Sequence, residues 1–278
     1  MTDLESRHIL SVVLGRPEGE INLAEAALLI ASEEYPDLDV PRYLKHLDDM
    51  GVALRARLAD EPRPERAVMA LNRYLFQEEG FHGNFEEYYD PKNSYLNDVI
   101  DRRVGIPITL STVYMEVARR AGVHVEGVGL PGHFIVRVVL GGHGLLVDPF
   151  HGGVLLTEAD CQERLDRIFA GRVKIASEML APCDRREILG RMLRNLKSIF
   201  MRREDYVRAL RAADLLLCVH PDSAEDLRDR GILYAALDCY GLALNDLEGY
   251  LALHPETPEA IELSGRIAAL RQKAARLN

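Results

Sequence analysis

The residues best suited to chemistry are His133 and Asp148, which flank two β-branched runs separated by a pair of glycines. A Gly-Gly pair between such runs predicts a β-hairpin with a two-residue turn. With the turn at this point, His133 and Asp148 become diagonal neighbours on one face of the sheet, roughly 7–8 Å apart at the backbone. A histidine oriented by a carboxylate is the part of a nucleophilic triad that activates the nucleophile.

The segment before this hairpin offers two hydroxyl groups. Apolar residues recur at helical spacing from 107 to 121, with Pro107 suited to the first turn and Gly122 to the end. Thr109 and Ser111 carry the hydroxyls near the start of this helix, and either could serve as a nucleophile activated by His133. Ser and Thr at helix starts are also ordinary capping residues.

The sequence gives less support to two other kinds of site, a reactive cysteine pair and a metal site. The cysteines, at 161, 183, 218 and 239, are widely spaced and form no C-x-x-C pair. A metal site could draw on His133, Asp148 and two further histidines, His143 and His151, but His143 falls at the hairpin tip, one strand length from His133. We therefore predict no metal and no cofactor.

The segment before residue 107 is predicted to be mainly helical. Asn22 followed by Glu25 predicts a capped amphipathic helix, and further helices are expected at 41–58 and 64–79. Asn93 and Ser94 are expected to cap a helix around 95–103, with substrate contact as the alternative. Arg102 and Arg103 are expected to form ion pairs with the acidic N-terminal helices. The tyrosines at 88, 89 and 95 are expected to pack around a cleft.

The last third of the chain repeats itself at a spacing of 34 residues. Leu193, Phe200, Tyr206, Ala209, Leu210, Leu217, His220 and Pro221 align with Leu227, Tyr234, Tyr240, Ala243, Leu244, Leu251, His254 and Pro255. This is the tetratricopeptide period, which predicts helix pairs at 190–202 with 205–219 and at 224–236 with 239–253. A fifth helix beginning at Pro258 would cap the stack. Such repeats form a concave surface for a protein or peptide, although two repeats could also serve only as a structural appendage.

Charge and hydropathy exclude several functions. The chain has 278 residues and a net charge of −10, and residues 1–90 alone carry 19 acidic and 9 basic side chains. No basic block is present that would bind nucleic acid or an anionic membrane. No apolar run approaches the ~18 residues of a membrane span, and the acidic N-terminus is unlike a signal peptide. We expect a cytoplasmic protein with a protein or peptide partner; the oligomeric state cannot be predicted.

Four motifs carry a family resemblance: YDPKNSYL at 89–96, RVGIPITLS at 103–111, GLPGHF at 129–134 and DPFHGG at 148–153. Together with the repeats, they closely resemble the SirB-type transglutaminase-like proteins. The resemblance implies an α+β fold with a papain-related core and a small antiparallel sheet. The predicted parts are an acidic helical segment at 1–90, the core at 91–182 and the repeats with a capping helix at 183–278.

The resemblance also implies a missing nucleophile. In active transglutaminase-like enzymes a cysteine begins the helix about fifteen residues before its terminal glycine, and here that position is Pro107. His133 and Asp148 match the other two triad members. The favoured hypothesis is a non-catalytic protein that binds a protein or peptide through its cleft and repeats. The alternative is a hydrolase or acyltransferase acting on a peptide or amide through a non-cysteine nucleophile. Residues predicted to contribute to binding are Asn93, Tyr95, Pro107 and Phe134.

Overall fold

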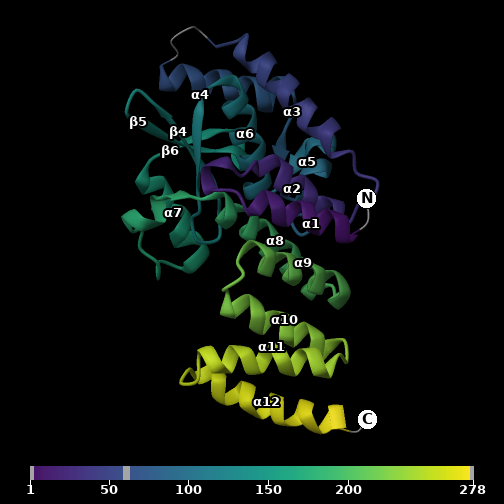
Figure 1. Ribbon diagram of the computed structural model, residues 1–278. Helices are drawn as coiled ribbons and strands as arrows, with labels where there is room; N and C mark the ends of the chain where they lie inside the picture. Colours follow the sequence, from purple (N-terminus) through teal and green to yellow (C-terminus); the bar gives the residue numbers. More distant parts are fainter. Residues whose placement is uncertain (1–2, 59–62, 276–278) are drawn as a thin grey trace. The chain divides into compact units, whose positions relative to one another are not determined.

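The computed structural model describes residues 3–58 and 63–275, apart from the side chains at 3, 4, 143, 258 and 259 (Figure 1). It divides into two compact units, Met1–Met192 and Leu193–Asn278. The predicted α+β class, with a small antiparallel sheet and C-terminal helical repeats, is confirmed. The domain boundaries predicted after residues 90 and 182 stay predictions.

Helices form most of the first unit. Its α-helices are α1 (Asp3–Leu14), α2 (Leu23–Ser32), α3 (Val40–Arg55), α4 (Pro64–Asn72), α5 (Leu96–Arg102), α6 (Pro107–Ala121), α7 (Glu158–Phe169) and the first part of α8 (Arg185–Arg202). Shorter helical segments are η1 (Glu18–Glu20), η2 (Arg73–Glu78), η3 (Pro91–Asn93), η4 (Pro149–His151) and η5 (Ser177–Leu180).

One five-stranded antiparallel sheet forms the centre of this unit. Its strands are β3 (His124–Val128), β4 (Ile135–Leu140), β5 (His143–Asp148), β6 (Val154–Leu156) and β7 (Pro182–Cys183), in the order β6-β5-β4-β3-β7. A separate parallel pair joins β1 (His82–Gly83) to β2 (Val104–Gly105). Helix α6 packs on β3 and β4, while Ile135 and Leu146 pack with Cys161 of α7. Because both faces of β4 are covered, Val136 and Val138 are also fully buried.

Helices α3 and α6 cross at a glycine. A Cβ atom on Gly51 would lie 2.3 Å from the Cβ atom of Arg120, so only glycine allows this approach. Beside the crossing, the Arg120 guanidinium lies 2.6 Å from the carboxylate of Asp48 and also pairs with Glu116. The acidic N-terminal segment is therefore held to the core by both packing and charge.

The predicted ion pairs of the central arginines are present. Arg102 lies 3.2 Å from Asp90, and Arg103 lies 3.1 Å from Glu79. Arg103 ends α5 in the left-handed conformation, with φ of 61°, and its guanidinium stacks over the ring of Phe81. These contacts neutralise part of the negative charge carried by residues 1–90.

Some predicted helix limits need correction. Helix α8 begins at Arg185 rather than 190, because Asp184 caps it by accepting from the Glu187 backbone N–H. The helix predicted at 64–79 changes to π geometry at Arg73, as the segment η2. Helix α7, for which the sequence analysis had no prediction, begins with a capping box of Thr157 and Asp160.

The second unit confirms the 34-residue repeat. Its helices are the end of α8, α9 (Tyr206–Val219), α10 (Ala224–Ala236), α11 (Tyr240–Leu253) and α12 (Pro258–Ala275). Glu204 and Asp238, which are 34 residues apart, both turn the chain in the left-handed conformation, with φ of 57° and 58°. Residues of α11 and α12 form a common core of Ala243, Leu247, Tyr250, Leu263, Ile267 and Leu270. Within the described part of the chain, no helix is long and apolar enough to span a membrane.

Candidate functional site

The predicted hairpin brings His133 and Asp148 together. Leu140 pairs with His143 across the Gly141-Gly142 turn, which is the predicted register. His133 lies just before β4 and Asp148 ends β5, and the His133 Nε2 atom is 2.9 Å from Asp148 Oδ2. The pair is shielded from water, since the His133 side chain is 10% exposed and the Asp148 side chain is fully buried.

Two further side chains meet the same carboxylate. Asp148 Oδ2 lies 2.8 Å from His151 Nδ1 and 2.6 Å from a guanidinium nitrogen of Arg164. Asp148 Oδ1 accepts hydrogen bonds from the backbone N–H groups of Phe150 and His151. Burial alone would raise the pKa of Asp148, but the hydrogen bonds from the two histidines and the charge of Arg164 lower it well below its ordinary value. Asp148 is therefore a carboxylate, not a carboxylic acid.

Arg164 could not be predicted as a site residue from the sequence, because it lies on α7, outside the motifs and without a local spacing signal. His151 has such a signal: it follows Asp148 by three residues, and the short helix η4 turns its side chain back toward the carboxylate. The sequence indicates His151 only as a possible metal ligand.

The loop that carries His133 is held by a second arginine that the sequence analysis missed. Arg191 of α8 donates to the carbonyl oxygens of Leu130 and His133, and its guanidinium lies 5.4 Å from the centre of the Phe134 ring. Burial lowers the pKa of Arg191, although the group remains a cation at neutral pH. Arg191 thus fixes the backbone from which the His133 ring extends.

The start of α6 holds neither candidate hydroxyl against His133. Thr109 Oγ1 donates to the carbonyl of Asn93 at 2.7 Å and accepts from the Ile106 N–H at 3.1 Å, which closes the first turn of the helix. Ser111 is fully buried and its hydroxyl has no hydrogen-bond partner among the described residues. Pro107 occupies the first helical position, as predicted. In this arrangement the only bonded partner of the His133 ring, within the part of the chain described, is Asp148.

Comparison with known proteins agrees with this fold. Residues 41–194 match the family described as the transglutaminase-like superfamily, and residues 196–268 match tetratricopeptide repeats. A "UPF0162 protein" of Xylella fastidiosa is 41% identical over 89% of each chain, and one of Vibrio cholerae is 30% identical over 91% of each chain.

The chain belongs to the transglutaminase-like superfamily. The predicted SirB-type resemblance, including the C-terminal repeats, is confirmed. "F-box only protein 21" of Mus musculus is 31% identical over 59% of this chain and 27% of its own length. No solved structure matches the chain.

Two cysteines, Cys161 and Cys183, lie within residues 41–194, which match the transglutaminase-like family. Cys161 is fully buried on α7, and burial raises the pKa of its thiol. Burial also raises the pKa of Cys183, which lies on the edge strand β7. A nucleophilic cysteine needs a lowered pKa and some exposure. Neither of these thiols has both properties.

The four predicted binding residues are buried. Asn93 is fully buried, Phe134 is 1% exposed and Tyr95 is 6% exposed. Pro107 is also buried, at the first position of α6. Direct contact of these side chains with a partner therefore stays a prediction.

The capping role expected of Asn93 was wrong. Tyr95 occupies the N-cap position of α5, and no side chain caps that helix. The Asn93 amide instead donates to the backbone carbonyls of Glu87 and Tyr88, at 2.7 and 3.3 Å. The Asn93 side chain does not cap the helix because it is hydrogen-bonded to the preceding loop.

Three of the four residues considered as metal ligands converge. The candidate ligand atoms of His133, Asp148 and His151 all lie within 4.8 Å of one another, whereas the side chain of His143 is outside the described part of the structure. Arg164 donates to the Asp148 oxygen that would face an ion, and supplies the positive charge that the carboxylate needs. The expectation that the protein holds no metal stays a prediction.

Proposed function

We propose that this protein binds another protein or peptide and that its transglutaminase-like core performs no cysteine-dependent catalysis. The observation that carries the proposal is the start of α6: Pro107 stands where the cysteine is expected, and Thr109 is engaged in closing the helix. A triad without a nucleophile beside the histidine cannot form a covalent intermediate. Asp148 then serves to hold the hairpin together through His133 and to attach α7 through Arg164.

The repeats support a binding role. Tetratricopeptide repeats present extended surfaces to protein partners. On the second unit, Arg194, Ser198 and Met201 are exposed along one face of α8. Arg194 keeps its guanidinium at the surface while pairing with Asp226 of α10 at 3.2 Å. An exposed methionine beside an arginine suits a protein contact, since both side chains offer contact area and adapt their shape.

Affinity capture tests the binding role. The full chain is used as bait with the variants Met201→Glu and Ile261→Glu, which introduce the same charge at exposed apolar positions on α8 and α12. We expect a specific partner that is lost with Met201→Glu and retained with Ile261→Glu. Failure to capture any protein above background in cross-linked extracts, or equal capture by both variants, would contradict the role assigned to α8.

One observation favours the alternative function. The His133 Nε2 atom contacts Asp148, which leaves Nδ1 without a hydrogen-bond partner among the described residues and available to take a proton from a nucleophile. A fluorophosphonate, which labels activated serine and threonine hydroxyls, tests this directly. We expect no labelling of the full chain. Labelling that disappears in both His133→Ala and Ser111→Ala, or in both His133→Ala and Thr109→Ala, would establish the hydrolase or acyltransferase instead.

The proposal includes a cytoplasmic location. Cys161, Cys183, Cys218 and Cys239 all lie within the described residues, and none of them forms a disulfide. A reducing compartment maintains thiols in this state. Fractionation of cells that express the full chain, with marker proteins of each compartment, checks this location.

A further inference from the structure

Next to the His133–Asp148 pair, five aromatic rings form an aromatic patch: Phe85, Tyr88, Tyr89, Phe150 and His151. The Phe85 ring centre lies 4.6 Å from that of Phe150 and 5.5 Å from that of His151. The Tyr88 ring continues the patch, at 6.0 Å from Phe150 and 5.2 Å from Tyr89. The patch connects the loop after β1 with the short helix η4.

Much of this patch faces solvent. Phe85 is 64% exposed, Tyr89 is 51% exposed and the His151 side chain is 38% exposed. A cluster of exposed aromatic rings costs free energy in water and marks an interaction surface. Tyr95 is buried and its ring meets Tyr35 edge to face, whereas Tyr89 is half exposed while its ring contacts Tyr88.

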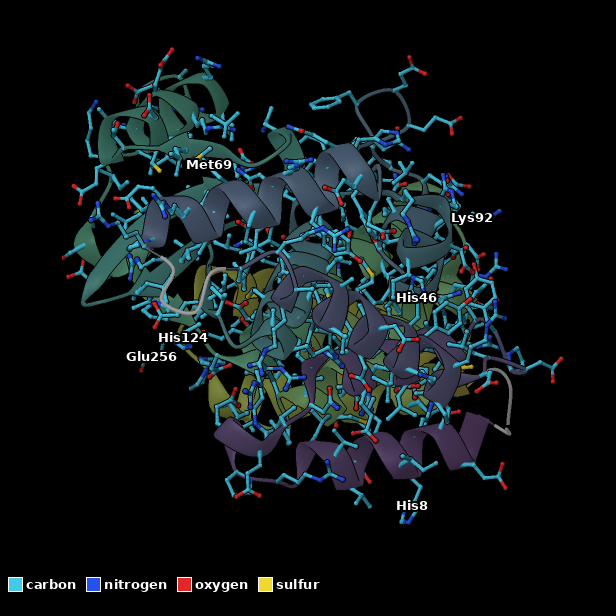
Figure 2. All side chains as sticks on the ribbon, turned by 90° about the horizontal axis from the view of Figure 1, so that it is seen from above. His8, His46, Met69, Lys92, His124 and Glu256 are labelled. Carbon is cyan, nitrogen blue, oxygen red and sulfur yellow. The ribbon has the colours of Figure 1, made fainter. Side chains whose placement is uncertain are left out.

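The loop that carries Phe85, Tyr88 and Tyr89 also carries two acidic residues. Glu86 and Glu87 lie between the aromatic residues in the sequence, and both are exposed. Neither carboxylate forms an ion pair within the described residues, whereas the neighbouring Asp90 is paired with Arg102. Lys92, the next basic residue along the chain, projects into solvent (Figure 2).

The loop is held in place before any partner arrives. Asn84 Oδ1 accepts from the Glu87 N–H at 2.9 Å, and the Asn84 amide donates to Asn93 Oδ1 at 3.2 Å. The buried side-chain amide of Asn93 donates to two loop carbonyls, and the backbone carbonyl of Asn93 accepts from the Thr109 hydroxyl of α6. A surface ordered in this way loses little conformational entropy on binding.

We propose that the aromatic patch receives an arginine or lysine side chain from an extended segment of the partner protein. The cation stacks on the exposed Phe85 ring, and the acidic residues Glu86 and Glu87 of the same loop complement its charge. The inference rests on the proposed binding function and adds the chemistry of the partner. The net charge of residues 1–90, with 19 acidic and 9 basic side chains, attracts a basic segment from a distance.

A labelled peptide of alternating alanine and arginine is the probe, measured by fluorescence anisotropy with the full chain. Peptides with citrulline or glutamate in place of arginine are the controls, because citrulline keeps the shape of arginine and removes its charge. We expect binding of the arginine peptide alone. No binding at millimolar concentration, or equal binding of the citrulline peptide, would overturn the proposal.

Variants locate the binding on the patch. Phe85→Ala is expected to weaken the arginine peptide about two- to fivefold, as an exposed cation–π contact predicts. Met69→Ala is its control, since Met69 is an apolar side chain on α4 that is 70% exposed and is not one of the five rings of the patch.

Charge variants complete the test. The double variant Glu86→Gln/Glu87→Gln should weaken binding of the arginine peptide. The control double variant Asp222→Asn/Glu256→Gln removes the same amount of charge from exposed positions of the second unit, and it should leave peptide binding unchanged. An unchanged affinity in the Phe85 variant, or equal losses in the two charge variants, would place the peptide elsewhere and contradict the proposal.

The two proposals fail separately. Loss of partner capture in Met201→Glu with unchanged peptide binding supports both a repeat surface and an independent patch. A captured partner whose binding is insensitive to Phe85→Ala would retain the binding function and overturn the patch as a partner site.

Discussion

Asp148 is the residue on which the candidate site converges. It is fully buried, and it accepts from two histidines, one arginine and two backbone N–H groups. A buried carboxylate is tolerated only when its charge and lone pairs are satisfied to this degree. Through these contacts it joins the end of β5 to the His133 loop and to α7.

Replacing Asp148 by Asn tests this role. The variant leaves Arg164 without its counter-charge, and we expect the free energy of unfolding at pH 7 to fall by about 3 kcal/mol. Urea unfolding followed by circular dichroism measures the change.

The same variant should alter the pH dependence of stability. Because the pKa of Asp148 is lowered in the folded protein, its contribution is complete above the unfolded value of about 3.9 and is lost as the pH falls below it. The difference between wild type and Asp148→Asn should thus shrink between about pH 4 and pH 3. A difference that stays constant across this range would show that Asp148 is not the titrating group.

At the scale of single elements, α6 links the two sides of the site. Its first turn holds Thr109 against Asn93, and Asn93 in turn orders the loop that presents the aromatic patch. Its other end approaches α3 at Gly51. The start of α6 therefore contacts the residue that orders this loop.

Two hydroxyls on α6 should respond differently to removal. Thr109→Ala loses a helix cap and the bond to Asn93, so we expect unfolding to become easier by about 1–2 kcal/mol. Ser111→Ala removes a buried hydroxyl that has no partner among the described residues, so stability should stay constant or rise by up to about 1 kcal/mol. Denaturant titration of both variants measures their free energies of unfolding. An equal loss of stability in Ser111→Ala would show that the Ser111 hydroxyl is hydrogen-bonded. Ser111 would then again be a candidate nucleophile.

The α3–α6 crossing predicts a steric cost. Gly51→Ala should destabilise the protein by about 1–3 kcal/mol, because the new methyl group meets the rigid Cβ of Arg120. Gly265→Ala is the matched control: its site in α12 has nothing within 4 Å, so the better helix propensity of alanine should stabilise by about 0.5–1 kcal/mol. Thermal unfolding of both variants measures these two changes in stability. A neutral Gly51→Ala variant would mean that the two helices separate easily.

At the scale of the whole molecule, charge and repeats are distributed unevenly along the chain. The acidic excess is confined to residues 1–90, and part of it is neutralised by Arg102, Arg103 and Arg120 of the core. The second unit is built from repeated helix pairs whose turns recur after 34 residues. The chain thus combines an acidic first unit, which contains the aromatic patch, with a separate repeat surface.

This charge distribution predicts salt-dependent association. The association rate of the arginine peptide should fall about three- to tenfold when the ionic strength rises from about 0.05 to 0.5 M, while its dissociation rate changes less. Stopped-flow anisotropy measures both rates. An association rate that does not depend on salt would show that the acidic segment does not attract the peptide.

The sequence by itself determined the features that depend on local periodicity. The alternation of β-branched residues and the Gly-Gly turn determine the hairpin register, and therefore the meeting of His133 with Asp148. Helical spacing and the flanking Pro107 and Gly122 determine α6, and the 34-residue period determines the repeats. These signals are readable because each links residues that are close in the chain.

Only the tertiary structure decided which distant residues complete the site. Arg164 reaches Asp148 from α7 and Arg191 reaches the His133 loop from α8, and neither position carries a local pattern. The burial of Thr109 and the exposure of Phe85 could not be predicted from the sequence either, because both depend on how helices and loops pack on the sheet. Such packing is set by contacts between segments far apart in the chain, which local periodicity does not encode.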